Sequence, residues 1–276
     1  MPSILLHLAA AALYAGLAAV SWRNRWRGPA LDRPRAALNH WERTWLLAAL
    51  ITHGATLGFG IFPGTAMHFG LSIAISMILW LAVAFYWIES FYTRMEGLQM
   101  LSLPVAALAV LLPTVFPAQH LLANADSIQF RLHFLIAMLA YSLFTLAALH
   151  AILMAVAEKQ LHRGKLTPLL ASLPPLLTME TLLFRLIHIA FVLLTLTLAT
   201  GILFSETLFG KALTFNHKTI FAILSWIIFA HLLAGRHFRG WRGRKALRWT
   251  LAGFVALLLA YIGTRFVLEV ILGRAA

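Results

Sequence analysis

The sequence predicts an all-α membrane protein, a polytopic bundle of about eight transmembrane helices with both termini on the outer side. Three observations predict it. Hydrophobic residues make up 61% of the chain and charged residues only 11%, with a mean hydropathy of +0.85, whereas a soluble domain is about half apolar. Apolar segments of about 20 residues recur along the whole chain. Lys and Arg concentrate in alternate loops between these segments.

Each expected span is an apolar run that ends at polar or turn-forming residues. No basic segment precedes the first run, "SILLHLAAAALYAGLAAVSW", and its length favours a retained helix over a cleaved signal peptide. The fourth run contains Pro104 and Pro113, which predict kinks. We expect one transmembrane domain over residues 1–276, without internal repeats. The expected spans are residues 3–22, 45–62, 67–89, 98–116, 131–156, 183–204, 219–236 and 249–272.

The charges of the loops predict the orientation of these spans. Six Arg lie in residues 23–44, six cations in 236–248 and three in 157–182, whereas the loops of the other side hold only Lys211 and Lys218. Because positive loops stay in the cytoplasm, both termini are expected outside. This distribution also accounts for the net charge of +13 without a nucleic-acid partner. The partner it indicates is the lipid bilayer, with anionic lipid contact as a consequence.

The residue types limit the chemistry that the chain can perform. No cysteine is present, which excludes disulfides, thiolate metal sites and thioether attachment of haem within the chain. Only nine acids occur, mostly in loops or at span ends, which disfavours a carboxylate-lined proton or cation path. Arg265 and Glu269 are expected to form a structural ion pair at the membrane edge. No phosphate loop, zinc motif or nucleophile elbow is present.

Twelve histidines are the strongest candidates for a functional site. At a rise of 1.5 Å per residue, one group of these histidines, the inner tier, lies about 8–12 Å from the cytoplasmic boundary of the membrane. Neutral imidazole ligates haem iron, although a single buried histidine more often forms an interhelical hydrogen bond. Several histidines at matching depth favour a cofactor site. The inner tier is His53, His150, His188 and His231, and the outer tier is His68, His133 and His217.

Four segments carry a resemblance to a known family. They are "LHFLIAMLAYSLFTLAALHAI", "FVLLTLTLATG", "GWRGRKA" and "YIG". Together they resemble the cytochrome c assembly superfamily that includes CcsA (also ResC) and HemX. The order and lengths of the spans are most similar to its YpjD-type members, which are bacterial multi-pass inner-membrane proteins. The resemblance is specific over residues 130–270. Over the residues that precede position 130 it rests on the pattern of the spans.

The resemblance implies a haem-handling protein that holds haem b non-covalently. His133 matches the position of an external haem ligand in CcsA-like members, and His53 matches an inner ligand. The partner of the inner ligand is expected near Ala234. His231 lies about one helical turn before that position and His237 about one turn after it, so either histidine can replace the ligand only if its helix is displaced along its axis.

Depth gives two candidate pairings of these histidines. We expect His53 with His231 in an inner site, and His133 with His217 or His68 in an outer site. The cations of residues 236–248 either anchor the topology alone or also attract haem propionates.

Two departures from the family separate this chain from the synthases. The tryptophan-rich WWD segment is expected before span seven, but residues 205–221 contain no Trp, and the second external histidine, expected near Leu272, is also missing. We therefore expect haem binding or transfer rather than catalysis, with cytochrome c biogenesis or haem-synthesis proteins as partners. The alternatives are a HemX-like regulator or scaffold without haem and a subunit of a cytochrome c synthase. A transporter is disfavoured, because inverted repeats and buried acids are missing.

Overall fold

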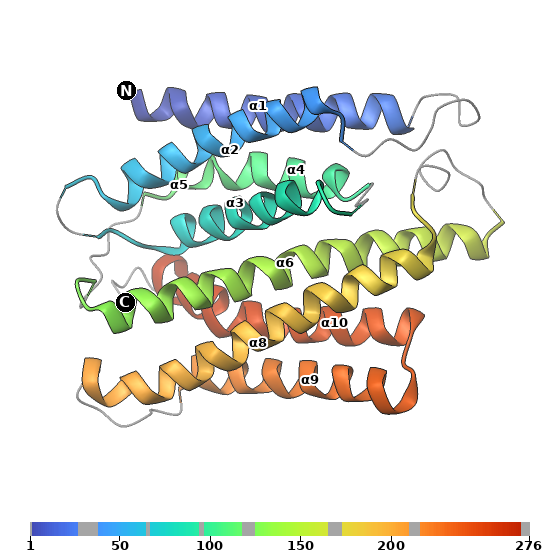
Figure 1. The fold of residues 1–276 in the computed structure, drawn as a ribbon. Coiled ribbons are helices and arrows are strands. Elements are labelled where there is room, and N and C mark those ends of the chain that lie inside the picture. Colours follow the sequence, from blue (N-terminus) through green and yellow to red (C-terminus); the bar gives the residue numbers. More distant parts are fainter. Residues whose placement is uncertain are drawn as a thin grey trace.

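The computed structural model describes residues 2–26, 38–64, 67–93, 97–117, 125–164, 173–209 and 216–271. Within these ranges the chain is all-helical, and seven helices are long and apolar enough to cross a membrane. The expected fold class is therefore confirmed (Figure 1). The helices are α1 (Pro2–Trp26), α2 (His40–Ile61), α3 (Leu71–Glu89), α4 (Gln99–Ala109), α5 (Leu112–Val115), α6 (Ile128–His162), α8 (Leu176–Phe209), α9 (His217–Arg239) and α10 (Gly243–Leu258), followed by the π-helical turns η1 (Leu259–Gly263) and η2 (Phe266–Ile271).

The fourth expected span differs from the others. It consists of α4 and the single turn α5, and its apolar length, Gln99–Val115, is shorter than that of the seven long helices. Pro113 stands in the first turn of α5, where its missing N–H breaks no helical hydrogen bond. Pro104 lies inside α4, which continues to Ala109, and the break between α4 and α5 comes just before Pro113.

The helices form two groups that meet between α3 and α6. In the first group α1 packs on α2 and α4, and α3 packs on α2 and α4. In the second α6 packs on α8 and α10, and α9 packs on α10. Figure 1 shows that α1 begins at the left end of the bundle, where α6 also begins and α2 ends. The basic turn between α9 and α10 lies at the right end, opposite to these segments.

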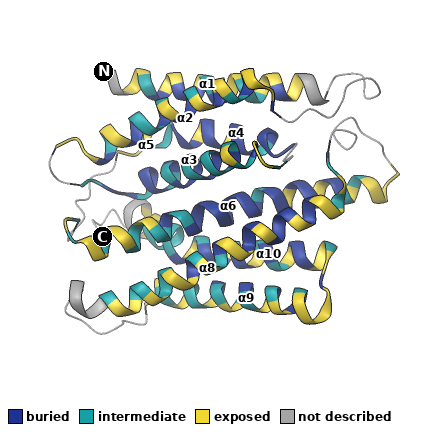
Figure 2. Ribbon diagram, viewed as in Figure 1, coloured by how far each residue is buried: buried dark blue, intermediate teal, exposed yellow. Residues whose placement is uncertain are grey.

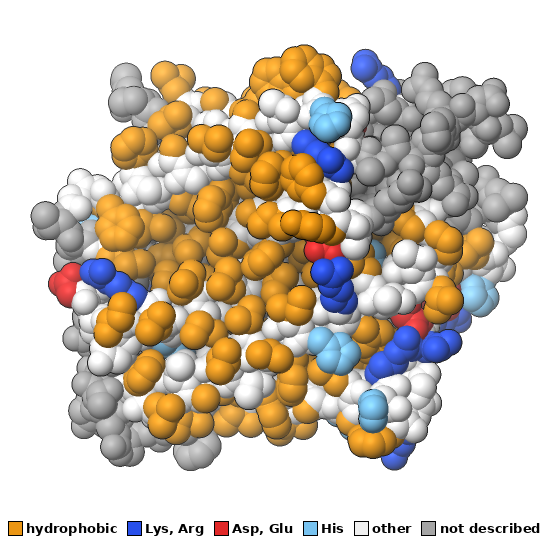
Figure 3. Space-filling view, viewed as in Figure 1, with side chains coloured by type: hydrophobic (Ala, Val, Ile, Leu, Met, Phe, Trp, Pro, Cys, Tyr) orange, Lys and Arg blue, Asp and Glu red, His pale blue; other side chains and the backbone are white. Residues whose placement is uncertain are grey.

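Burial follows the pattern of a protein whose outer faces meet lipid. Figure 2 shows buried residues along α3 and the middle of α6, and exposed ones on the outward faces of α1, α8 and α9. Large apolar side chains on outward faces, such as Ile51 and Leu203, remain 65% and 69% exposed. Figure 3 shows a broad hydrophobic band over α3, α6 and α8. In a bilayer this band contacts acyl chains instead of water.

Small and aromatic residues set the closest approach in the second group. Phe229 of α9 is fully buried and stacks on Phe144 of α6, with ring centroids 4.0 Å apart. Gly253 of α10 faces the same ring, and a Cβ added there would lie 2.8 Å from Phe229. The Ser225 hydroxyl of α9 donates to the Gly253 carbonyl over 3.0 Å. Gly253 thus allows α9 and α10 to pack closely, as small residues do in membrane bundles.

The close approach at Gly253 can be tested by adding one methyl group. We expect Gly253→Ala to lower the melting temperature of the detergent-purified protein, because Phe229 is held against Phe144 and cannot move away. Overpacking of this kind costs about 1–3 kcal/mol. Gly58→Ala is the matched control, since a Cβ there meets nothing within 4 Å. Equal melting temperatures for the two variants would contradict the packing that we describe.

Candidate functional site

His133 is the histidine whose surroundings best prepare it to bind a ligand. It lies near the start of α6, half-buried, with Nδ1 2.9 Å from the Thr200 hydroxyl of α8. That hydroxyl donates its only proton to a carbonyl within α8, at 2.7 Å from the oxygen of Leu196. The hydroxyl must therefore accept from Nδ1–H, which leaves Nε2 of His133 as an unprotonated lone pair. The ring lies close to α8, since a Cβ on Gly201 would be in van der Waals contact with Cε1 of His133 at 3.4 Å.

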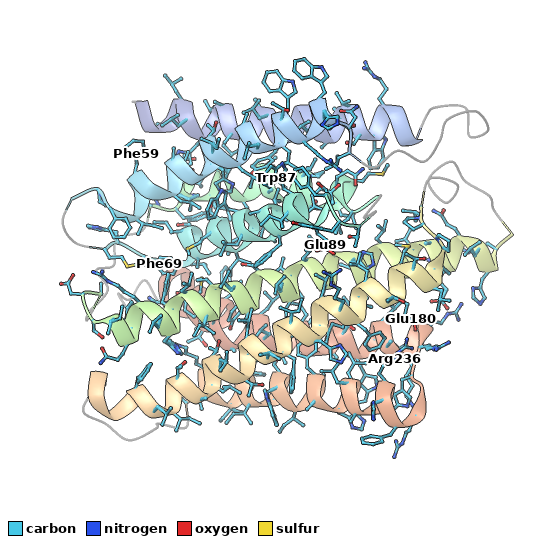
Figure 4. The ribbon with its side chains drawn as sticks, viewed as in Figure 1. Phe59, Phe69, Trp87, Glu89, Glu180 and Arg236 are labelled. Carbon is cyan, nitrogen blue, oxygen red and sulfur yellow. The ribbon has the colours of Figure 1, made fainter. Side chains whose placement is uncertain are left out.

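The other two outer-tier histidines come from segments at the same end of the bundle. Phe69, next to His68, packs edge-on against Phe134 of α6 with ring centroids 4.8 Å apart, and Figure 4 shows it above the first turns of that helix. His217 is the first residue of α9, and the next residue, Lys218, lies within electrostatic reach of His133. The structure therefore brings the segments of the expected outer site together.

Positive charge accompanies this histidine cluster. The Lys218 ammonium and the Arg265 guanidinium lie 5.7 and 5.8 Å from the centroid of the Tyr261 ring in η1. Tyr141 of α6 packs edge-on against Tyr261 at 6.2 Å, and its hydroxyl donates to the Leu257 carbonyl over 3.0 Å. The expected partner of Arg265 is Glu269, whose side chain lies outside the described ones. The outer end thus combines an imidazole lone pair with two nearby cations.

His53 occupies a different environment, between α1, α2 and α3. It is fully buried, with Nε2 2.9 Å from the Ser76 hydroxyl and Nδ1 3.3 Å from the Tyr14 hydroxyl. The Tyr14 and His53 rings also meet edge-on, with centroids 5.7 Å apart. Both nitrogens of His53 are therefore occupied by hydroxyls from neighbouring helices. This arrangement matches the interhelical hydrogen bond that we weighed against haem ligation.

The structure does not bring His53 and His231 together. His231 faces outward from α9 and meets the rings of Trp241 and Trp249 edge-on, at 5.0 and 4.8 Å. Figure 1 shows α2 and α9 on opposite sides of the bundle, with α3 and α6 between them. Equal depth along two helices does not make their side chains face each other. His237 is exposed and meets the ring of its neighbour Phe238, with centroids 4.8 Å apart.

The remaining inner-tier histidines bond to carbonyls. His150 of α6 is buried and donates from Nε2 to the Met179 carbonyl of α8 over 2.9 Å, and its Nδ1 has no hydrogen-bond partner among the described residues. His188 is exposed and donates from Nδ1 to the Phe184 carbonyl one turn earlier, over 2.6 Å. The inner tier is thus spread over several helix faces.

Glu180 of α8 is a key residue that our sequence interpretation missed. Its buried carboxylate accepts from Arg236 at 2.5 Å and from the backbone N–H of Gly243 at 3.2 Å, and Arg242 lies 3.7 Å away. Arg236 also donates to the Trp241 carbonyl over 3.2 Å. Figure 4 shows Glu180 and Arg236 facing each other at the right end. One carboxylate therefore holds the α9–α10 turn on α8, and the signal for it was a lone acid at the start of an apolar run.

Comparison with known proteins identifies relatives over most of the chain. The family model described as cytochrome C assembly protein matches residues 41–272. The inner membrane protein YpjD of Escherichia coli K12 is 34% identical over 60% of this chain and 60% of its own length. An uncharacterized 28.8 kDa protein of Azospirillum brasilense is 33% identical over 75% of this chain and 78% of its own. The cytochrome c biogenesis protein CcsA of Prochlorococcus marinus is 36% identical over 32% of this chain and 28% of its own length. The chain thus aligns with less than two thirds of the YpjD protein.

The role of Glu180 can be measured by removing its charge. We expect Glu180→Gln to destabilise the purified protein by about 3 kcal/mol, because Arg236 then lies partly buried without its carboxylate. Glu158→Gln is the control, since Glu158 contacts the same turn at 2.9 Å through Arg244, an arginine whose side chain is 58% exposed. The control is expected to change stability by less than about 1 kcal/mol. If Glu180→Gln and Glu158→Gln lowered the stability equally in thermal unfolding, Glu180 would not hold the α9–α10 turn more strongly than Glu158 does.

Proposed function

The chain belongs to the cytochrome c assembly protein family, and from that premise we propose that it binds haem b non-covalently and passes it on within the bacterial inner membrane. The observation that carries this proposal is the state of His133. Its Nδ1–H is held by Thr200, so Nε2 presents a lone pair at the outer end of the bundle. A histidine that ligates iron is typically oriented in this way, with its second nitrogen donating to a fixed acceptor.

The other groups at this end are suited to the rest of a haem. His68 or His217 is the candidate for the second axial ligand, because each lies in a segment that comes to the start of α6. Lys218 and Arg265 supply positive charge for the propionates, which Arg and Lys bind through charge-assisted hydrogen bonds. Bound haem would supply an iron that carries one electron between its ferric and ferrous forms. The protein groups bind and orient it.

We do not propose that the chain forms thioether bonds. Residues 205–221 contain no Trp, so the tryptophan-rich segment expected of a haem-presenting synthase is missing from this part of the sequence. The proposed role of the outer site is therefore to bind haem and transfer it. Its partners are proposed to be proteins of cytochrome c biogenesis or haem synthesis, which receive or supply the haem.

A HemX-like scaffold without haem is the second candidate function. The observation in its favour is that His53 and His150 bond to groups of neighbouring helices, so these histidines contribute to packing. On this hypothesis the histidines serve the fold alone. Removing His133 would then leave the function of the partner protein intact.

The orientation in the membrane is part of this proposal, and the cysteine-free sequence makes it testable. We propose that the basic α9–α10 end faces the cytoplasm and the His133 end faces the periplasm. Asp126→Cys and Arg163→Cys place one thiol at each end of α6, both at exposed positions. In intact spheroplasts, a membrane-impermeant maleimide is expected to label Asp126→Cys and to spare Arg163→Cys until the membrane is broken. The reverse pattern would invert the topology.

The haem proposal is tested by the visible spectrum of the detergent-purified protein, oxidised and reduced with dithionite. We expect a Soret band and sharp reduced α and β bands, and we expect His133→Ala to remove them. Thr200→Val keeps the shape of the side chain but removes the acceptor, and it is expected to weaken haem affinity about 10- to 100-fold. His162→Ala is the control, because His162 is exposed at the far end of α6. The same spectra of His68→Ala and His217→Ala identify the second ligand.

Two outcomes would overturn this assignment. A folded protein that takes up no added haem would favour the scaffold function. Bands that persist in His133→Ala but vanish in His53→Ala or His231→Ala would move the haem to the inner tier.

A further inference from the structure

A shallow hollow opens on the outward face of α9, close to the basic turn. It has a volume of about 310 Å³ and is lined by His231, Ala234, Gly235, Phe238 and Arg239. Its lining surface is apolar throughout, and Arg239, the last residue of α9, contributes only the apolar part of its side chain to it, with the guanidinium outside the hollow. An apolar hollow beside a cation at the membrane boundary matches the two ends of a lipid molecule.

The two tryptophans next to the hollow make it a fixed feature. The Trp241 ring packs against Gly235 so closely that a Cβ on Gly235 would overlap it. The backbone N–H of Trp241 donates to the Gly235 carbonyl over 3.1 Å, and the Trp241 ring stacks on Trp249 with centroids 5.9 Å apart. Because Trp241 is only 8% exposed, the α9–α10 turn is held in place beside the hollow.

His231 is the polar group that this surface leaves unsatisfied. It is exposed on the outward face of a spanning helix, and it makes no hydrogen bond within the part of the chain that the structure describes. An imidazole that faces hydrocarbon is costly unless it meets a polar partner. His231 lies about 12 Å along the helix from Arg239, below the membrane boundary. The ester carbonyls of a phospholipid lie below its phosphate and can accept a hydrogen bond at such a depth.

The cations near the hollow divide into paired and unpaired groups. Arg236 and Arg242 are engaged by Glu180, and Arg244 is engaged by Glu158. Among the described residues no carboxylate pairs with the other cations of residues 236–248, which are Arg239, Lys245 and Arg248, and of these Lys245 lies over the Trp241 ring, 3.7 Å from its centroid. The charge that remains beside the hollow is therefore positive, and its complement is an anionic headgroup.

We propose that this hollow binds one anionic phospholipid. Arg239 holds the phosphate, His231 donates to an ester carbonyl, and an acyl chain lies over Ala234 and Gly235 against Phe238. The site is independent of haem, because it uses the face of α9 that points away from the bundle and lies at the opposite end from His133. It goes beyond general attraction of a basic loop to the membrane, since it requires a particular shape.

The experiment is native mass spectrometry of the detergent-purified protein, titrated with phosphatidylglycerol or phosphatidylcholine. We expect one phosphatidylglycerol to bind saturably and phosphatidylcholine to bind at least about fivefold more weakly. Arg239→Gln is expected to weaken phosphatidylglycerol by about fivefold. Ala234→Trp fills the hollow at an exposed position and is expected to abolish the saturable binding. Arg23→Gln, which removes an exposed cation from the same end of the bundle, is the matched control and should change the affinity less than twofold.

Several results would overturn the proposal. Equal losses in Arg239→Gln and Arg23→Gln would show diffuse attraction without a site. Equal binding of phosphatidylcholine would remove the role of charge, and unchanged binding in Ala234→Trp would place the lipid elsewhere. Displacement by millimolar inorganic phosphate would identify a free-anion site, and displacement by haem would assign the hollow to a porphyrin.

Discussion

Hydrocarbon offers no water to a polar group, and this constraint governs how the helices of this chain pair with one another. A hydroxyl, indole or imidazole in a spanning helix therefore needs a polar partner, which the protein or a lipid headgroup must supply. The Trp80 indole therefore donates to the Leu50 carbonyl, and the Ser225 hydroxyl donates to the Gly253 carbonyl. Because the apolar side chains resemble the lipid around them, these polar contacts and the close approach at small residues define which helix faces meet.

The same constraint separates histidines that serve the fold from one that is suited to a ligand. His53 has a hydroxyl on each nitrogen, so binding iron would require one of these contacts to be given up. His133 has one nitrogen held by Thr200 and the other available. His150 also has one nitrogen without a hydrogen-bond partner among the described residues, but it is only 2% exposed and lies inside the bundle, so a ligand-binding role requires both an available nitrogen and access from the end of the bundle. This distinction favours the outer end for haem even though His53 is the more deeply buried residue.

Much of the fold was predictable from the sequence, because lipid imposes a strong pattern on composition and length. The all-helical class and the place of the proline-containing fourth span follow from apolar runs and from the chemistry of Pro104 and Pro113. The sequence did not predict which side chains from different helices contact each other. Sequence gives the depth of a residue along its helix, but the direction in which it points depends on tertiary packing, which is why His53 and His231 lie on opposite sides. Glu180 was missed because its partners come from a turn about 60 residues later.

Helix α9 connects the two ends that carry function in our proposals. It begins with His217 and Lys218 at the outer site and ends at Arg239 beside the hollow, about 34 Å away. Three of its contacts are spread along its length: Glu180 binds Arg236 at one end, Phe229 stacks on Phe144 in the middle, and Ser225 bonds to Gly253 on α10. A helix fixed at these points cannot slide along its axis by a residue without breaking all three. The position of Lys218 near His133 therefore depends on a carboxylate at the opposite end of the bundle.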